Sequence, residues 1–176
     1  MTYYRPNNIP ELIALALDRD FPKFYQNRDL HLPNRALNLG PGNKVIQGTV
    51  GLELPEWDAN SGVIPFPDFH FNEIFAFHFF EHLDCETAIK ILNECERVLK
   101  VGGVLTIACP HAMSEMQVQD LTHKSFWHED TLEVLMNNPH YVPTGYVWKL
   151  KLKSSFIAGL KYRNLMVFYQ LEKWSR

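Results

Sequence analysis

The strongest constraint on the fold is a strand, a helix and a second strand that follow one another between Glu73 and Cys109. Glu73–Phe77 is strongly apolar, and Val104–Cys109 is a second apolar run. Cys85–Lys100, between them, repeats apolar residues with a period of 3.6: Ala88, Ile91, Leu92, Cys95, Val98 and Leu99. Asp84 is placed to cap this helix and Gly102 to stop it. A helix between two strands predicts a parallel pair, and therefore an α/β fold.

Segments on the C-terminal side add strands to this unit. Tyr146–Lys153 alternates polar and apolar residues, Leu165–Glu172 is rich in strand formers, and residues 154–164 are too many for a tight turn. We interpret the two strands as an antiparallel pair at one edge of the sheet. A helical pattern follows Pro10, and this helix is expected to pack outside the sheet. A second helical pattern covers His128–Met136. We therefore expect a Rossmann-like, doubly wound, mostly parallel sheet with antiparallel edge strands, in three α/β/α layers.

Composition and charge exclude several kinds of partner. The chain has 176 residues, which suits one domain, and its net charge of −3 creates no strong field that would attract nucleic acid. The only basic cluster, Lys149, Lys151 and Lys153, alternates with apolar residues, as on the wet face of a strand. No apolar run approaches the ~20 residues that span a bilayer, so no membrane partner is expected. An odd cysteine count and the lack of a signal peptide favour the reducing cytoplasm.

A second feature, between Ala36 and Glu53, indicates a nucleoside site. The apolar run Ala36–Leu39 ends at the turn Gly40-Pro41-Gly42, and a second short strand ends on the carboxylate of Glu53. In open α/β sheets such a glycine turn lets the backbone approach a ligand, and the carboxylate accepts hydrogen bonds from a ribose diol.

Three nucleoside ligands were weighed against this segment. A triphosphate loop needs a hydroxyl residue after its lysine, but Lys44 is followed by Val45. A dinucleotide fingerprint needs a small residue where this chain has Val45. The acid of that fingerprint also follows its glycines by ~20 residues, whereas Glu53 follows by only about a dozen. S-adenosylmethionine carries no phosphate and needs only a glycine turn beside its amino-acid end and a carboxylate for its ribose. The segment meets this smaller requirement.

Longer motifs over about residues 35–127 also agree with an S-adenosylmethionine site. LNLGPG, the acid in GLEL, IPFPDFHFNEIFAFHFFEHL and ECERVLKVGGVLTIACPH together resemble the class I S-adenosylmethionine-dependent methyltransferases. The likeness is strongest to a small branch from phages and bacteria with a very short connection between its first two strands. That branch carries a DPTH motif, which resembles Asp120-Leu121-Thr122-His123 here. The sequence departs from the branch pattern at Pro41, Glu53, Asn72 and Leu121.

The resemblance implies an enzyme that transfers a methyl group from S-adenosylmethionine to an acceptor, which attacks the methyl group in line. It divides the single domain into an N-terminal helix and loop (1–34), a cofactor-binding core (35–110) and a substrate-side loop with edge strands (111–176). The acceptor is expected to be a small molecule, because no second recognition domain is evident and basic residues are few. A phage-encoded chain would work in the host cytoplasm.

Site residues are expected at the carboxyl edge of the sheet and in the loop above it. Cofactor contacts are expected from Gly40, Pro41, Gly42, Glu53, Leu54, Asp58 and His78. If the acceptor must lose a proton, the candidate catalytic residues are His78, His111, His123 and Asp120, since histidine titrates near ~6.5. Ile64 is expected either beside the adenine or in the core.

Two further functions stay open. The chain could be a non-catalytic S-adenosylmethionine-binding or assembly subunit, which would bind the cofactor without turnover. His78-Phe79-Phe80-Glu81-His82 also matches H-x-x-E-H, so a zinc hydrolase using His78, Glu81 and His82 is a remote alternative. We expect no metal, because His78 closes an apolar strand and the two imidazoles would be splayed apart. Glu81 and His82 are instead expected to cap the long helix or to hydrogen-bond locally.

Overall fold

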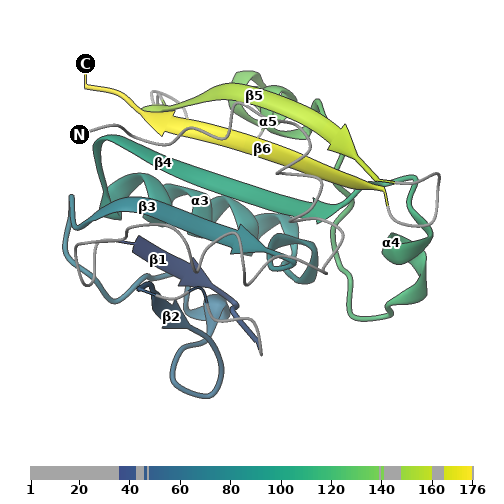
Figure 1. Ribbon diagram of the computed structural model, residues 1–176, viewed down its shortest axis with the longest axis horizontal. Helices are drawn as coiled ribbons and strands as arrows, with labels where there is room; N and C mark the ends of the chain where they lie inside the picture. Colours follow the sequence, from purple (N-terminus) through teal and green to yellow (C-terminus); the bar gives the residue numbers. More distant parts are fainter. Residues whose placement is uncertain are drawn as a thin grey trace.

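The computed structural model describes residues 36–42, 46, 48–138, 140, 148–159 and 165–175. They contain a six-stranded sheet in the order β2-β1-β3-β4-β6-β5 (Figure 1). Its strands, in chain order, are β1 (Ala36–Leu39), β2 (Val50–Leu52), β3 (Phe71–Phe77), β4 (Leu99–Pro110), β5 (Leu150–Ala158) and β6 (Met166–Lys173). The helix expected after Pro10 lies outside the described residues.

Strand directions confirm the predicted mixed sheet. β1 pairs in parallel with β2 and β3, and β3 pairs in parallel with β4. β6 then runs antiparallel to both β4 and β5. The sheet is therefore of the Rossmann-like α/β type, parallel through its first four strands, with β5 and β6 forming the expected antiparallel pair at one edge.

The long helix α3 (Cys85–Val98) buries the predicted apolar stripe, and Asp84 caps its start by accepting a hydrogen bond from the Thr87 N–H at 2.8 Å. Its end differs from the prediction, because α3 stops at Val98 and β4 begins at Leu99. Leu99 is fully buried and pairs with the first residue of β3, so the chain becomes extended before the glycines are reached. The expected glycine stop at Gly102 was wrong.

Gly102 and Gly103 instead make an irregularity inside β4. Gly102 has a φ of 78°, and the pairing between β3 and β4 shifts register here. A Cβ atom on Gly103 would lie 3.0 Å from the Asn72 carbonyl oxygen and 2.8 Å from that of Lys100. The two glycines let the strands pass closely where the register shifts.

The edge strands lie further along the chain than predicted, since β5 begins at Leu150 and β6 spans Met166–Lys173. β5 continues to Ala158, so part of the expected 154–164 connection is strand. Leu150 is buried while Lys151 and Lys153 are exposed, which confirms the wet-face interpretation of the lysine cluster. The Nζ atoms of these two lysines lie 4.4 and 5.3 Å from the centre of the Trp174 ring. The short helix expected over His128–Met136 is α5 (Thr131–Asn137).

Two described helices, α3 and α5, lie behind the sheet in Figure 1, while the short α4 (Glu115–Gln119) lies beyond the end of β4. Most of the phenylalanines between residues 66 and 80 belong to the core, with Phe71 and Phe80 completely buried and Phe69 half exposed. Ile64, expected either beside the adenine or in the core, is completely buried in the core. The cysteines Cys85, Cys95 and Cys109 form no disulfide.

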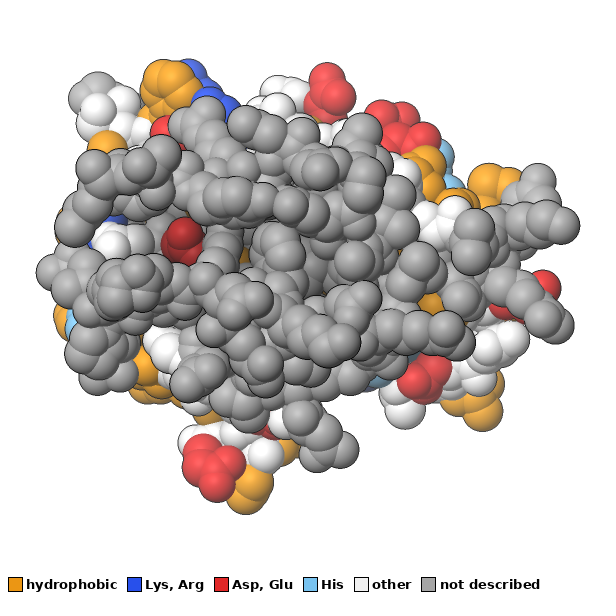
Figure 2. Space-filling view, viewed as in Figure 1, with side chains coloured by type: hydrophobic (Ala, Val, Ile, Leu, Met, Phe, Trp, Pro, Cys, Tyr) orange, Lys and Arg blue, Asp and Glu red, His pale blue; other side chains and the backbone are white. Residues whose placement is uncertain are grey.

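None of the helices in the described part of the chain combines the length and apolar character that a membrane crossing requires. In the space-filling view of Figure 2, described acidic side chains lie at several separate points around the rim. The few described Lys and Arg side chains on that face form no broad basic area.

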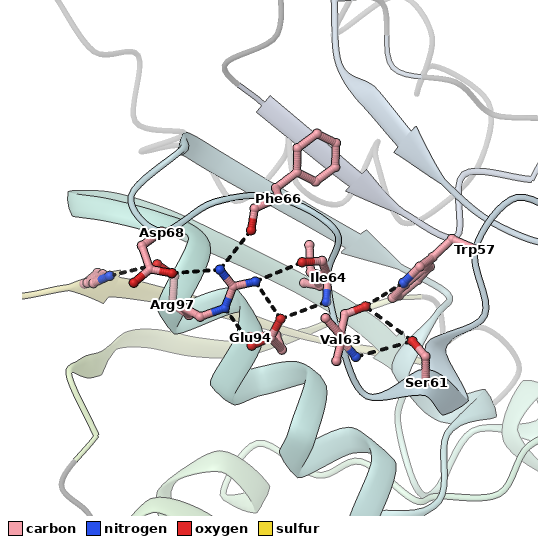
Figure 3. A network of polar contacts seen from close by, with 9 residues as sticks. Trp57, Ser61, Val63, Ile64, Phe66, Asp68, Glu94 and Arg97 are labelled. Atoms are coloured by element: carbon pink, nitrogen blue, oxygen red, sulfur yellow. Dashed lines mark hydrogen bonds and ion pairs between the residues drawn. The ribbon is translucent and has the colours of Figure 1, made fainter.

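A polar network holds the loop before β3 against α3 (Figure 3). The Arg97 guanidinium of α3 donates to the carbonyls of Ile64 and Phe66 and to the Asp68 carboxylate, each at 2.8 Å. Glu94 accepts two further bonds from Arg97 at 2.7 Å and one from the Ile64 N–H at 2.8 Å. One side chain of the ERVLK motif therefore fixes the path of residues 64–68.

Candidate active site

A cavity of about 730 Å³ opens at the carboxyl ends of the parallel strands. Its lining includes residues at or near the ends of these strands: Asn38 of β1, Leu52 of β2, Phe77 of β3 and Ala108 of β4. Met166 and Phe168, at the start of antiparallel β6, complete this edge. The strand order reverses at β1, and open α/β sheets bind ligands at such a switch point. The volume falls in the range of small-molecule sites, roughly 300–1,000 Å³.

The glycine turn and Glu53 form one structural unit at this edge. Gly40 and Gly42 have φ values of 60° and 50°, which residues with a side chain rarely adopt. The Gly42 N–H donates to Oε2 of Glu53 at 2.6 Å, and the Gly40 N–H donates to the Leu52 carbonyl at 2.9 Å. Glu53 is exposed and lines the cavity, so its carboxylate is both fixed by the turn and accessible to a ligand.

The segment after Glu53 forms the adjoining wall. Asp58 caps the single 3-10 turn η1 (Ala59–Ser61) through a bond from the Asn60 N–H at 2.9 Å. The Trp57 ring stacks on Phe79 with 6.1 Å between ring centres, and its Nε1–H donates to the Val63 carbonyl at 2.8 Å. Since Val63 adjoins the residues held by Arg97, this wall is fixed to α3.

Every residue predicted on the cofactor side lines the same cavity: Gly40, Pro41, Gly42, Glu53, Leu54, Asp58 and His78. They come from the ends of three strands and one loop, and the fold brings them together as expected. The four catalytic candidates are placed less uniformly, since His78 alone among them lines the cavity.

His78 lies directly after β3 with a φ of 52°. Its N–H donates to the Ala108 carbonyl at 2.9 Å, which fixes this strained residue against β4. The side chain is 40% exposed, and its Nδ1 lies 3.1 Å from Oε1 of the fully buried Glu81. A carboxylate only accepts, so Nδ1 carries the proton and Nε2 keeps a lone pair.

His111 is almost completely buried, at 2% exposure, and does not line the cavity. Its Nδ1 accepts from the Met113 N–H at 3.1 Å, so its Nε2–H donates to Glu129 at 2.9 Å. The carboxyl pKa of Glu129 is lowered by its own backbone N–H first and by His111 second. With both ring nitrogens in use, His111 is a structural residue next to the edge rather than a base facing the cavity.

Asp120 and His123 belong to a loop that docks on the turn after β3. The Asp120 carboxylate accepts bonds from the Thr122 hydroxyl at 2.6 Å and the Thr122 N–H at 2.8 Å, and these bonds lower its pKa. His123 is nearly buried, and its Nδ1–H donates to the Gln117 carbonyl at 3.1 Å. The N–H groups of Lys124 and Ser125 both donate to the Glu81 carbonyl, at 2.7 and 3.1 Å. The loop is therefore built onto Glu81, with neither Asp120 nor His123 lining the cavity.

Sequence reasoning missed several lining residues, among them Asn38, Trp57, Phe79, His82 and Lys124. Glu81 and His82 were expected to cap α3 or to hydrogen-bond locally: Asp84 supplies the cap, while Glu81 makes a local bond with His78 at 3.1 Å. Both instead lie in a single 3-10 turn, η2 (Phe80–His82), so the helical geometry of a zinc-protease motif is absent. The EHL tripeptide was the available signal for His82, because it follows a strand end where ligands bind.

Residues 35–107 match the family model of a methyltransferase domain. The match covers β1 to most of β4, and therefore the glycine turn, Glu53 and the Arg97 network. No curated protein gives a significant match to the chain.

Solved structures with the same fold are numerous. A methyltransferase structure from Archaeoglobus fulgidus, described as S-adenosylmethionine-dependent, is 19% identical, with 93% of this chain and 94% of that chain covered and a TM-score of 0.59. One from Methanosarcina mazei, described likewise, is 13% identical over 82% and 94% of the two chains, with a TM-score of 0.61. The Burkholderia thailandensis 1,6-didemethyltoxoflavin-N1-methyltransferase, solved with its substrate and S-adenosylhomocysteine, is 14% identical over 98% and 93%, with a TM-score of 0.55. At these identities the likeness establishes the fold.

Proposed function

We propose that this chain, whose residues 35–107 match the family model of a methyltransferase domain, is a class I S-adenosylmethionine-dependent methyltransferase that methylates a small molecule in the cavity at the carboxyl edge of its sheet. The observation that carries the proposal is the fixed unit of glycine turn and carboxylate. The Gly42 N–H holds Glu53 at 2.6 Å beside the exposed end of β1. Such a unit suits the ribose and amino-acid parts of the cofactor, and it needs no phosphate cradle.

The residues that line the cavity fall into two chemically different groups, which we assign to two ends. Gly40, Gly42 and Glu53 are assigned to the cofactor end, where a carboxylate also favours the positive sulfonium. His78, His82, Lys124 and Phe168 are assigned to the other end. We assign this second end to the acceptor. Alignment of acceptor and methyl group in such a pocket supplies roughly 7–11 kcal/mol of the barrier.

His78 is the base candidate that the geometry favours. Its Nδ1–H is held by Glu81 at 3.1 Å, so the remaining lone pair on Nε2 is available to take a proton from the acceptor. The buried carboxylate stabilises the imidazolium that would form. His111 lacks such a lone pair, because both of its nitrogens already have partners.

The Burkholderia neighbour supports a small acceptor, since the 1,6-didemethyltoxoflavin bound to it is a small molecule. The division into residues 1–34, 35–110 and 111–176 remains part of this proposal. In it, the last segment supplies the acceptor end through Lys124, Met166 and Phe168.

The test is calorimetric titration of the whole chain with S-adenosylmethionine and S-adenosylhomocysteine. Glu53→Ala is expected to weaken binding by roughly 10- to 100-fold, because hydrogen bonds to a charged group are worth about 1.5–3 kcal/mol. Glu56→Ala is the matched control, since Glu56 is exposed three residues away and does not line the cavity. No binding by the wild type, or equal losses in the two variants, would contradict the proposal.

Turnover separates an enzyme from a binding subunit. When the wild type is incubated with S-adenosylmethionine and a pool of small metabolites, it is expected to form and release S-adenosylhomocysteine. His78→Gln is expected to form much less. Tight cofactor binding without any release would instead support the non-catalytic alternative.

A further inference from the structure

Glu81, His82 and His123 bring three metal-ligating groups together beside the cavity. One ligand atom from each residue lies within 4.8 Å of the others, and the rings of His82 and His123 have centres 4.9 Å apart. Glu81 and His82 come from the turn after β3, whereas His123 comes from the docked loop. His82 also lines the cavity, so the cluster borders the end assigned to the acceptor.

Both histidines have their Nδ1–H groups committed to acceptors. Nδ1 of His123 lies 3.1 Å from the Gln117 carbonyl, which only accepts, so the proton is on this nitrogen. The Thr122 hydroxyl gives its proton to Asp120 at 2.6 Å, so at 3.0 Å it accepts from Nδ1 of His82. In each ring Nε2 is therefore the nitrogen with the lone pair. Histidine ligands of metals characteristically have their other nitrogen fixed in this way.

Glu81 supplies a buried oxygen that lacks a hydrogen-bond partner. Its side chain is completely buried, Oε1 pairs with His78, and Oε2 is buried without a hydrogen bond to any described residue. A buried carboxylate is costly unless its charge is paired or bound to a cation. The nearby Cys109 side chain is an uncharged, buried thiol, so it supplies no positive charge to pair with Glu81.

A second histidine and carboxylate cluster shows the contrast. His111, His128 and Glu129 also have ligand atoms within 4.8 Å of one another. There, however, both nitrogens of His111 are already bonded, to the Met113 N–H and to Glu129. Glu129 is partly exposed and has partners in His111 and His128. This second cluster is complete without a cation. In the first cluster, Oε2 of Glu81 has no hydrogen-bond partner among the described residues, and Nε2 of His123 lies 3.8 Å from the Asp120 carboxylate, beyond hydrogen-bond distance.

The geometry points to a binding site for one divalent transition-metal cation formed by Nε2 of His82, Nε2 of His123 and Oε2 of Glu81. Two imidazoles and one carboxylate are a donor set that suits Zn²⁺, Co²⁺ or Fe²⁺ and leaves positions for other ligands. This departs from the expectation of no metal, since His123 replaces His78 in the ligand set. His78 is not a ligand in this set: its Nδ1–H holds Oε1 of Glu81, while its Nε2 stays available for the base role proposed above.

The position of the site suggests its use, on the assumption that the proposed methyl transfer is correct. Through His82 the cation would border the acceptor end, where its open positions take an oxygen or nitrogen of the acceptor. A bound cation lowers the pKa of such a group and so favours the attacking form. The acceptors that fit best are small molecules with a hydroxyl or another chelating donor next to the methylated atom.

The experiment is direct metal binding by the whole chain, after treatment with a chelator and without cofactor. Titration with CoCl₂, followed by calorimetry and by the visible absorption of protein-bound Co²⁺, is expected to show about one cation per chain. His123→Ala and Glu81→Gln are expected to weaken binding by more than about 100-fold, and Thr122→Val by about 10-fold through the lost support of His82. His128→Ala, in the second cluster, is the matched control and is expected to change nothing.

Titration of each variant with S-adenosylhomocysteine, in the absence of metal, shows whether the variant is folded. If Glu81→Gln does not fold, His123→Ala tests whether the metal site exists, because His123 lies in the docked loop rather than in the core turn. Failure of the wild type to bind Co²⁺, or an equal loss in His128→Ala and His123→Ala, overturns the site. Co²⁺ binding without S-adenosylhomocysteine binding would leave the metal site standing and remove the proposed function.

Discussion

At the scale of single residues, two glycines in one turn have different tasks. Both Gly40 and Gly42 adopt positive φ values, which cost other residues roughly 1–2 kcal/mol. At Gly40 a Cβ atom would lie 2.7 Å from the ring of Phe79, whereas at Gly42 the nearest atom is 4.0 Å away. Phe79 is buried between Trp57 and Phe80 and has little room to move. Gly40 is thus required by packing as well as by conformation.

Alanine at each glycine separates the two effects. Gly42→Ala is expected to lose only the conformational part, roughly 1–2 kcal/mol in the free energy of unfolding. Gly40→Ala is expected to lose more and to weaken S-adenosylhomocysteine binding further, because displacement of Phe79 alters the cavity wall. Urea unfolding and calorimetry measure both quantities. Equal losses in the two variants would show that the contact with Phe79 is not important.

Glu94 gives the molecule a predictable dependence on pH. The hydrogen bonds from Arg97, its main partner, lower the carboxyl pKa below the usual value of 4.5. The stability that Glu94 gives to the folded state is therefore fully present above about pH 4.5, and it is lost as the pH falls through the lowered pKa. Glu94→Gln is expected to cost roughly 1–2 kcal/mol at neutral pH and progressively less in acid.

Unfolding by urea at pH 7 and at lower pH values measures this difference. Glu86→Gln is the control, because Glu86 is 81% exposed in its pair with Lys90 and such pairs contribute little. A difference between wild type and Glu94→Gln that stayed constant down to strongly acidic pH would exclude the titration of Glu94 as its origin.

At the scale of elements, the sequence located most strands and helices but misplaced several ends. The periodicity of α3 was strong enough to predict its buried face, since each stripe residue contributes to one core. Its end was predicted from glycine propensity, whereas the structure decides it by pairing the buried Leu99 with β3. That pairing is a long-range contact, so local propensity at Gly102 carried no information about it. The same holds for β5, whose extension to Ala158 depends on its partner β6.

The candidate site shows a similar division. That the residues expected on the cofactor side line one cavity could be predicted, because glycine turns and strand-end acids are coded by nearby residues such as Gly40 and Glu53. The link between the 120–125 loop and Glu81 could not be predicted, because it consists of backbone bonds between distant segments. Hence His123 was expected in the cavity, and its contact with His82 was not foreseen.

Arg97 couples an element of the core to the cavity wall. Arg97→Lys keeps the charge but loses the planar fork that serves two carbonyls and two carboxylates. We expect a loss of about 2 kcal/mol in stability and weaker S-adenosylhomocysteine binding, because the loop that carries Trp57 and Asp58 loosens. Lys90→Ala, on the exposed side of α3, is the control. Lower stability with unchanged cofactor affinity would show that the loop and the cavity are independent.

At the scale of the whole molecule, the cavity gathers residues from Asn38 to Phe168, so a ligand stabilises the complete sheet. S-adenosylhomocysteine at 100 times its Kd is expected to add about 2.7 kcal/mol, which raises Tm by about 5–10 °C for a chain of this size. Thermal unfolding followed by circular dichroism measures the shift. Glu53→Ala is expected to show little of it at the same concentration. A ligand-induced rise of the same size in that variant would place the binding site elsewhere.

The antiparallel strand β6 has a consequence for how the molecule is made. It lies between β4 and β5, although β5 precedes it in the chain, so β5 cannot reach its place before β6 exists. Met166 and Phe168 at the start of β6 also line the cavity, although they lie far along the chain from the glycine turn. During synthesis the first four strands can leave the ribosome with their glycine turn already formed, yet the pocket lacks a wall until β6 has emerged and paired. Cofactor capture by the nascent chain therefore follows the emergence of β6, and it reports that translation has passed this strand.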